Sequence, residues 1–260
     1  MSSDDGAVRL SIAEGAAAVV FDRPAARNAM TWTMYEQLGA ICERLAADRS
    51  VRVATLRGLG GQAFVAGTDI AQFMSFSNGD DGVAYERRID QGIALIEALP
   101  MPTVAVIEGF AIGGGLAIAT ACDFRIASTG SRFGVPIART LGNCLSIANL
   151  ARLSAAFSPQ RVKRMLLRAE LISADEALAC GYLQQLCAAG ELDAAAATLC
   201  AELAALAPVT QRVSKEGLRR LTAQRMPEGD DLIRQCYGSA DFHAGVAAFV
   251  ARQPPRWTGD

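Results

Sequence analysis

The pattern of apolar and polar positions near the N-terminus predicts a β-hairpin followed by a helix. Val8–Ile12 and Ala16–Phe21 are short apolar segments on either side of Gly15, which is typical of two antiparallel strands joined by a tight turn. Thr33 and Glu36 have the spacing of a capping box, so we expect a helix to begin here. Its apolar face would consist of Met34, Leu38, Ile41, Cys42 and Leu45.

Further along the chain, apolar segments alternate with glycine-rich loops and helical patterns. Val51–Leu56 and Thr103–Ile107 are rich in β-branched residues and both precede glycines, as in the strand-then-loop step of an α/β unit. Tyr85–Leu99 has helical periodicity and ends at prolines, and Leu116–Ala121 is a short run of small residues after a glycine triplet. These elements predict an α/β fold.

Helical patterns dominate the second part of the chain. Beyond about residue 143 strand patterns become scarce and Ala, Leu and Arg-rich helices take over. Ser173 and Glu176 have the spacing of another capping box. We therefore divide the chain into an α/β core at 1–195 and a C-terminal helical region at 196–260.

Composition and charge narrow the class of protein. Of the 260 residues 51% are hydrophobic and 20% are charged, which supports a large core and excludes global disorder. The chain has 25 Lys and Arg against 27 Asp and Glu, with no block of like charge, so a small-molecule ligand is favoured over nucleic acid. We see no secretion signal and no uncharged apolar run of the roughly 18 residues that span a bilayer. A cytoplasmic protein is expected.

The cysteines and the histidine limit the available chemistry. Seven cysteines, an odd number without C-x-x-C spacing, are typical of reduced core thiols. A single histidine, His243, excludes a zinc site built on several imidazoles, and any Ser-His-Asp triad would have to use it. For His243 itself we favour a packing or interface role over that of a general base.

The glycine triplet Gly113–Gly115 enters a helix after the strand that ends at Ile107. Backbone N–H groups at such a helix start can stabilise an anion or a polarised carbonyl oxygen. Taken alone, the triplet could equally serve tight packing between strand and helix. A dinucleotide loop is less favoured, because no acidic residue ends a second strand about 20 positions later.

Four motifs, taken in order, resemble one known family. Gly60–Ile70, with the sequence GGQAFVAGTDI, resembles the G-x-A-F-x-A-G-x-D-[LI] signature of the crotonase, or enoyl-CoA hydratase/isomerase, superfamily. Phe21–Met30 resembles the first CoA-contacting loop of that family, and Ile107–Gly115 resembles its glycine-rich loop. Ala247-Ala248-Phe249 with Arg252 and Pro255 resembles its closing helix. The resemblance covers nearly the whole chain.

This resemblance implies a fold, an assembly and a ligand. The expected fold is α/β, a crotonase-like spiral of ββα units with a helical C-terminal trimerisation region, and the expected assembly is a homotrimer or a dimer of trimers. The substrate would be an acyl-CoA, with coenzyme A as part of the thioester and no permanently bound cofactor or metal. Its carbonyl would lie between the backbone amides of Thr68 and Gly114. Such N–H groups can stabilise an enolate oxygen without an ionisable side chain.

The resemblance also assigns residues to the CoA part of the ligand. Arg27 suits a phosphate because its guanidinium is permanently charged. Asp69 and Asp123 are acidic residues within matched motifs, and we favour structural roles for both, with Asp69 as a helix cap. The full set of expected CoA contacts is Arg23, Ala26, Arg27, Ala66, Gly67, Thr68, Asp69, Ile70, Lys215, Phe249 and Arg252.

Two positions depart from the hydratases of the family. One hydratase glutamate follows the glycine triplet by two residues, where this chain has Ala117. The other follows the proline of a G-x-P-E motif, where this chain has Ile137, or Ala138 if the alignment shifts by one residue. None of these side chains can transfer a proton, so hydration by the two-glutamate mechanism is not expected.

Other polar residues nearby offer alternative chemistry. Arg139, Asn143, Cys144 and Ser146 are the nearest candidates. Cys144 is the best nucleophile by type, although a buried structural thiol is the more common role for such a residue. Arg139 could orient an anionic acyl group or could be a surface charge.

Three functions remain open at this point. The first is a lyase or isomerase that stabilises a thioester enolate through the oxyanion hole. The second is a catalytically silent acyl-CoA-binding member of the family. An NAD-dependent oxidoreductase is the least favoured, because it depends on the glycine triplet alone.

Overall fold

The computed structural model describes residues 5–188, 190–223 and 229–258. The chain begins with the predicted hairpin, in which β1 (Ala7–Ala13) and β2 (Ala16–Asp22) pair in antiparallel fashion. Gly15 takes the turn with a φ of +78°, a conformation in which glycine avoids the steric penalty of a Cβ atom. The predicted hairpin is therefore confirmed.

Two sheets form the body of the molecule. The larger has six strands in the order β1-β2-β3-β5-β7-β10, with β3 (Val53–Gly58), β5 (Thr103–Ile107), β7 (Phe124–Ser128) and β10 (Gln185–Cys187) all parallel to their neighbours. The smaller has the order β4-β6-β8-β9, formed by Ala63–Val65, Phe110–Ile112, Arg132–Gly134 and Ile172–Ser173.

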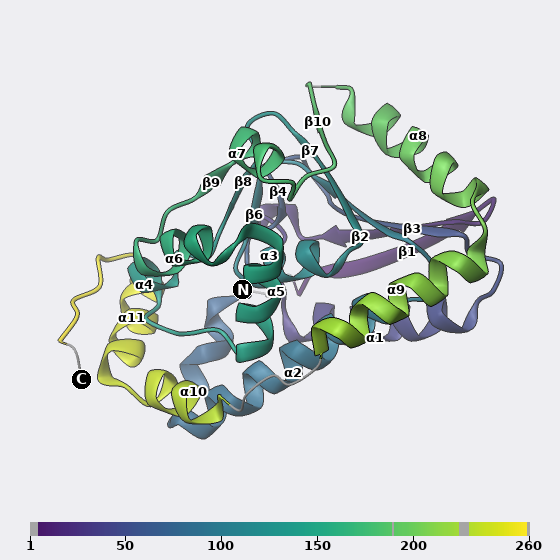
Figure 1. Cartoon of the computed structure of the whole chain (residues 1–260). Helices are drawn as coiled ribbons and strands as arrows, with labels where there is room; N and C mark the ends of the chain where they lie inside the picture. The colour runs from purple at the N-terminus through teal and green to yellow at the C-terminus, as the bar shows by residue number, and fades with distance from the viewer. Residues whose placement is uncertain (1–4, 189, 224–228, 259–260) are drawn as a thin grey trace.

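Successive strand pairs divide between these two sheets. β3, β5 and β7 lie in the larger sheet, and the strand that follows each of them, β4, β6 and β8, lies in the smaller one. Helices follow each pair: α2 (Gly79–Glu97) after β4, α3 (Gly114–Ala121) after β6, and α4 (Ile137–Thr140) and α5 (Ile147–Phe157) after β8. The repeated strand–strand–helix step is the predicted spiral of ββα units (Figure 1).

Two helices begin at different residues from those predicted. α1 (Trp32–Ala47) is capped by Thr31, whose hydroxyl accepts a hydrogen bond from the amide of Met34. The predicted cap at Thr33 is wrong, because Thr33 lies inside the helix and its hydroxyl donates to the Asp5 carboxylate. α2 begins before Tyr85, since Asn78 and Asp81 form a capping box that starts it at Gly79.

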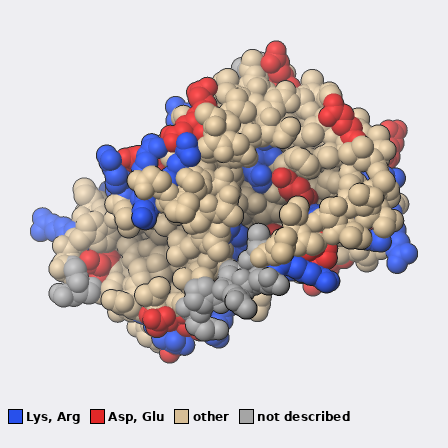
Figure 2. Space-filling view, in the orientation of Figure 1, with Lys and Arg blue, Asp and Glu red and all other residues tan. Residues whose placement is uncertain are grey.

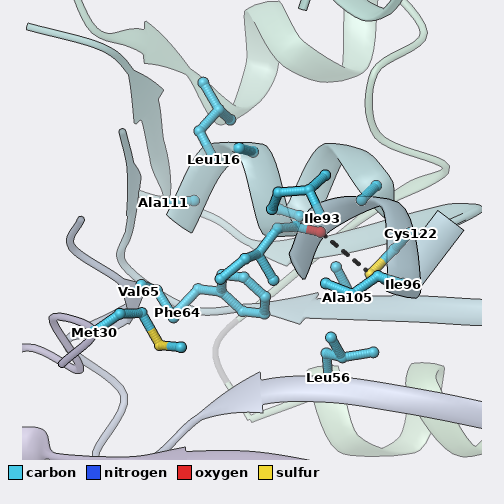
Figure 3. Packing of buried hydrophobic residues seen from close by; sticks show 14 of the residues in the cluster. Met30, Leu56, Phe64, Val65, Ile93, Ile96, Ala105, Ala111, Leu116 and Cys122 are labelled. Atoms are coloured by element: carbon cyan, nitrogen blue, oxygen red, sulfur yellow. Dashed lines mark hydrogen bonds between the residues drawn. The ribbon is translucent and has the colours of Figure 1, made fainter. Parts of the chain in front are cut away.

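The two faces of the larger sheet bury different partners. On β5, Val104 and Val106 pack with α8 (Leu192–Ala205), while Ala105 and Ile107 belong to the main core. This division follows from the alternation of side chains along a strand. Figure 3 shows the main core, where the ring of Phe64 lies among side chains from β3, β5 and α2.

Helices complete the C-terminal part. These helices are α6 (Pro159–Leu167), α7 (Ala174–Ala179), α9 (Pro208–Ala223), α10 (Asp230–Tyr237) and α11 (Ala240–Val250). Two short 3-10 helices, η1 (Pro24–Ala26) and η2 (Ile70–Ser75), lie in the first half of the chain, after β2 and β4. Ser173 caps α7 as predicted, since its hydroxyl accepts from the amide of Glu176. α10 packs on α2 and α11 packs on η2, so the chain's end returns to the first half of the molecule.

Within the described ranges no single helix is long and apolar enough to cross a bilayer. α8 and the adjoining Pro208–Leu221 meet that test of length and composition only as a pair, which is bent by 102°. All seven cysteines are unpaired, and Cys42, Cys122 and Cys187 are buried as core thiols.

Candidate active site

A cavity of about 740 Å³ lies where the predicted motifs meet. Its wall combines the loops after β2 and β4, the start of α3, one face of α2, the segment from Pro136 to Asn149 and the end of α11. Every expected CoA contact except Lys215 lines it: Arg23, Ala26, Arg27, Ala66, Gly67, Thr68, Asp69, Ile70, Phe249 and Arg252. Segments far apart in the sequence therefore form one wall.

Asn28 anchors the first loop of this wall. It is fully buried with a φ of +58°, a left-handed conformation in which asparagine is more common than most residues. Its Nδ2 donates to the carbonyl oxygens of Leu59 at 3.0 Å and Ala63 at 2.8 Å, and its Oδ1 accepts from the amide of Arg23 at 3.0 Å. The first loop is thus fixed to the chain around β4.

The first and second loops are also held directly together. The Arg23 guanidinium forms an ion pair with Asp69 at 2.8 Å, and Asp69 caps η2 by accepting from the amide of Ala71, as predicted. The amide of Met30 donates to the Gly67 carbonyl, and the amide of Asp69 donates to the Met30 carbonyl. These bonds flank Thr68 on both sides and fix its backbone.

Thr68 and Gly114 come close together on the cavity wall. A Cβ atom added to Gly114 would lie 3.3 Å from Thr68 Oγ1 and 2.7 Å from Tyr35 Oη, so the close approach requires glycine. Gly114 is the first residue of α3, where a backbone N–H has no partner within the helix. Both residues line the cavity, and neither N–H group has an acceptor among the described residues.

Two tyrosine hydroxyl groups form hydrogen bonds with the side chain of Thr68. Thr68 Oγ1 is hydrogen-bonded to Tyr35 Oη at 2.9 Å and to Tyr85 Oη at 2.9 Å. Burial raises the pKa of Tyr35 and of Tyr85 well above the usual value. Both phenols are therefore neutral near pH 7 and add no negative charge beside the amides.

Two arginines line the cavity near solvent. Arg27 is exposed, and its guanidinium lies 5.8 Å from the centre of the Phe110 ring. Arg252 is exposed beside Phe249, whose side chain is 48% exposed. No described carboxylate pairs with either guanidinium, so both can bind an anion. A phosphate group matches the fixed, planar donors of arginine.

The two positions without a glutamate both lie on the cavity. Ala117, which is buried, and Ile137 contribute to its lining, whereas Ala138 faces a separate shallow pocket beside α10. The structure therefore favours Ile137 over Ala138 as the second of these positions. Neither side chain at the wall can exchange a proton.

Arg139, Cys144 and Lys215 lie outside the cavity lining and have other partners. The Arg139 guanidinium donates to the carbonyl oxygens of Arg168 at 3.1 Å and Ala169 at 2.7 Å. A hydrogen bond with Cys236 and burial raise the pKa of the Cys144 thiol, which disfavours the thiolate that a nucleophile needs. Neither Arg139 nor Cys144 is therefore positioned to contact a ligand in the cavity.

Lys215 is the third of these side chains. Its ammonium forms an ion pair with Asp123 at 2.7 Å and donates to the Met101 carbonyl at 3.2 Å. Asp123 also accepts from the amide and the hydroxyl of Thr103, which confirms its structural role. Lys215 thus ties α9 to the end of the larger sheet.

The remaining candidates divide between the cavity and the scaffold. Asn143 lines the cavity, and its buried Oδ1 has no partner among the described residues. Ser146 caps α5, because its hydroxyl accepts from the amide of Asn149. His243 is exposed on α11 and is not part of the cavity lining. In the described ranges no three His, Cys, Asp or Glu side chains gather as a metal site.

Glu86 is a charged residue of the cavity lining that none of the sequence motifs indicates. Glu86 of α2 is 2% exposed and lines the same cavity as Thr68, Gly114 and Ala117. The sequence did carry a signal, because Glu86 lies three residues from both Val83 and Ile89 on the apolar face of a helix. A charged residue on such a face is a candidate functional group.

Comparisons with known proteins agree with the motifs. The family model described as enoyl-CoA hydratase/isomerase matches residues 11–260. The (E)-benzylidenesuccinyl-CoA hydratase of Thauera aromatica is 34% identical over 262 residues, covering 97% of this chain and 99% of the relative. The short-chain-enoyl-CoA hydratase of Clostridium acetobutylicum is 30% identical over 245 residues, covering 92% of this chain and 93% of the relative.

Solved structures share the fold over the whole chain. A methylmalonyl-CoA decarboxylase complexed with 2S-carboxypropyl CoA superposes with a TM-score of 0.89 at 25% identity, and all of both chains is covered. The similarity therefore includes both the ββα spiral and the C-terminal helices.

Proposed function

This chain belongs to the enoyl-CoA hydratase/isomerase family, and from that premise we propose that it binds an acyl-CoA and stabilises the enolate of its thioester. The thioester oxygen would accept hydrogen bonds from the amides of Thr68 and Gly114. Coenzyme A would enter as part of the substrate, with no permanently bound cofactor.

The observation that carries this proposal is the pair of unpaired amides on the cavity wall. A Cβ atom added to Gly114 would lie 3.3 Å from Thr68 Oγ1, so the two residues are close neighbours, and the surrounding hydrogen bonds fix the backbone of Thr68. Donors fixed in advance stabilise charge that develops on an oxygen without reorganising, and one such donor typically contributes about 10²–10³ in rate.

The cavity is suited to both ends of an acyl-CoA. Arg27 and Arg252 lie where the phosphates of the nucleotide end could be bound. Apolar side chains that include Ile89, Leu145 and Leu153 line the inner part and suit an acyl chain.

The proposed reaction is not hydration by two glutamates. Ala117 and Ile137 occupy the places of the two hydratase carboxylates, although several relatives of the chain are named as hydratases. General acid–base groups contribute typically about 10²–10⁴ in rate. A lyase or isomerase reaction that passes through the same enolate fits this site better.

A second candidate is an acyl-CoA-binding protein without catalytic activity. The apolar Ala117 and Ile137 favour it, because a binder needs no proton transfer at these positions. Measuring the exchange of acyl-chain protons with solvent distinguishes the two functions. The proposed enzyme catalyses this exchange, whereas a protein that only binds acyl-CoA does not.

Titration calorimetry with a panel of acyl-CoA thioesters, free CoA and NAD tests the proposal. We expect binding of at least one thioester, and crotonyl-CoA hydration far below the roughly 10 s⁻¹ of a typical enzyme. Binding of NAD without any thioester would instead support an oxidoreductase. Hydration of crotonyl-CoA at an ordinary enzymatic rate would contradict the assignment of Ala117 and Ile137.

A further inference from the structure

We propose that Glu86 is the proton-transfer residue of this site, acting on the acyl carbons next to the thioester. The inference rests on the proposed function, since it needs the thioester at Thr68 and Gly114. It assigns to α2 a task that the hydratase positions, Ala117 and Ile137, cannot perform in this chain.

The helix α2 places the carboxyl group on the cavity wall. Val83, Ile89 and Ile93 are buried on the same face of α2, so the helix directs this face inward. Tyr85, the neighbour of Glu86, bonds to the hydroxyl of Thr68. The helix that carries Glu86 is thus linked directly to the residue whose amide would hold the thioester oxygen.

Hydrogen bonds fix the carboxyl group from two sides. Its Oε1 accepts from the Tyr237 hydroxyl at 2.7 Å, and its Oε2 accepts from the amide of Ser146 at 3.0 Å. Asn143 Nδ2 in turn donates to the Tyr237 hydroxyl at 3.2 Å. Each carboxyl oxygen keeps a further lone pair that can take part in proton transfer.

No described Lys, Arg or His forms an ion pair with this carboxyl group. The guanidinium of Arg152 on α5 binds two other carboxylates of α2, Asp90 at 3.1 Å and Glu97 at 2.8 Å. Burial raises the pKa of Glu86 to about 7, with a smaller contribution from Asp90, although the bonds from Tyr237 and Ser146 oppose the shift. A group with a pKa near the working pH can both accept and return a proton.

The titratable and charged groups around Glu86 come from four parts of the chain. Tyr85 and Asp90 lie on α2, Tyr35 on α1, Tyr237 and Cys236 on α10, and Cys144 and Arg152 on the segment from Pro136 to α5. Burial raises the pKa of the three tyrosines far above 7. The pKa of Glu86, at about 7, is therefore well separated from the pKa values of the tyrosines around it.

The proposed step needs no further reactant. The Glu86 carboxylate takes a proton from the α-carbon, the C–H electron pair forms the C=C bond of the enolate, and the carbonyl pair moves to the oxygen held by Thr68 and Gly114. The carboxylic acid then returns the proton to the α-carbon, or to the γ-carbon of an unsaturated acyl chain. The second outcome moves a double bond without oxidation or reduction.

Exchange of the α-protons of butyryl-CoA and octanoyl-CoA with D2O, followed by NMR, tests this role. We expect the wild-type protein to catalyse exchange, and Glu86→Gln to lower its rate by about 10²-fold or more. Calorimetry should show that Glu86→Gln binds octanoyl-CoA within about threefold of wild type, since binding depends on other residues. Glu97→Gln is the matched control, because Glu97 is on the same helix but outside the cavity lining.

A pH profile separates proton transfer from a purely structural role. The exchange rate should rise with pH through about 7, because the carboxylate is the form that accepts the proton. Tyr237→Phe removes a donor that favours the carboxylate, so it should move this midpoint to higher pH while Glu86 remains. A midpoint that stays in place in a folded Tyr237→Phe protein would contradict the assignment.

The remaining outcomes distinguish the two claims. Wild-type binding without exchange, or equal exchange in wild type and Glu86→Gln, overturns the role of Glu86 and leaves acyl-CoA binding intact. No thioester binding by the wild type overturns the proposed function, and this inference with it. If Glu86→Gln does not fold, Glu86→Asp is the alternative variant, because it keeps a carboxyl group but shortens the side chain by one methylene. Exchange by Glu86→Asp at the wild-type rate would contradict the proton-transfer role of Glu86.

Discussion

Gly114 is a residue of the proposed oxyanion site at which little space is left for a side chain. Gly114→Ala would place a Cβ 2.7 Å from Tyr35 Oη, so either the amide or the tyrosine must move. We expect a loss of about 10²–10³ in the rate of proton exchange, because a displaced amide no longer donates to the thioester oxygen. Binding of free CoA, measured by calorimetry, should not change.

A second substitution checks the cause of that loss. Tyr35→Phe removes the hydroxyl that a new Cβ would meet, so Gly114→Ala combined with Tyr35→Phe should recover part of the rate. Gly92→Ala is the matched glycine control on α2, where a Cβ would meet nothing within 4 Å. Full activity of Gly114→Ala alone would show that this amide is not a donor.

Glu86 should also make the stability of the protein depend on pH. The pKa of its carboxyl group rises from 4.5 to about 7 on folding, so the native state binds the proton more tightly than the unfolded state. Stability then falls as pH rises across this window, by about 3 kcal/mol for a shift of this size. Glu86→Gln cannot titrate and should escape this loss.

Urea unfolding of both proteins between about pH 4.5 and pH 8 measures this effect. The free energy of unfolding of wild type, relative to Glu86→Gln, should decrease across the range. If the difference in unfolding free energy between wild type and Glu86→Gln stayed constant across this range, folding would not raise the pKa of Glu86.

At the scale of elements, the start of α1 offers a clear test of helix capping. Thr31→Ala removes the hydroxyl that accepts from the Met34 amide, and we expect a loss of about 1 kcal/mol in the free energy of unfolding. Thr33→Ala should cost less than about 0.5 kcal/mol, because Thr33 makes only an exposed bond to Asp5. A larger loss of stability in Thr33→Ala than in Thr31→Ala would instead identify Thr33 as the cap.

Local patterns predicted most elements but not where each begins. Alternation and β-branched residues were sufficient for β1, β2 and β5, since these signals lie within the strands themselves. The start of α2 at Gly79 depends on Asn78 and Asp81, two polar residues outside the apolar periodicity that placed it at Tyr85. Capping, a property of single polar side chains, decides such boundaries.

The helix α9 exposes apolar side chains to solvent. Val209, Val213 and Leu221 are 59%, 63% and 68% exposed, and Figure 2 shows uncharged surface on the side of α8 and α9, with charged side chains between the uncharged areas. Exposed apolar surface of this kind is typical of an interface. We expect light scattering at micromolar concentration to show a trimer or a hexamer, and Val213→Asp to favour smaller species. A stable wild-type monomer would contradict this expectation.

The candidate site could be predicted only in part, because some of its residues are brought together by tertiary packing. The loops around Thr68 and Gly114 carry their signal in neighbouring residues, so the motifs pointed to both. The apolar spacing of α2 indicates that Glu86 is buried, but only the packing of α2 places it at the cavity. The partners of Arg139 and Lys215 lie on distant segments and likewise depend on tertiary structure, which no local pattern contains.

A crystal structure of the wild-type protein with octanoyl-CoA would show directly whether the amides of Thr68 and Gly114 hold the thioester oxygen. We predict this oxygen at roughly 2.7–3.1 Å from both backbone nitrogens, with the acyl chain in the apolar part of the cavity. A thioester bound elsewhere, or an oxygen that contacts neither amide, would contradict the account.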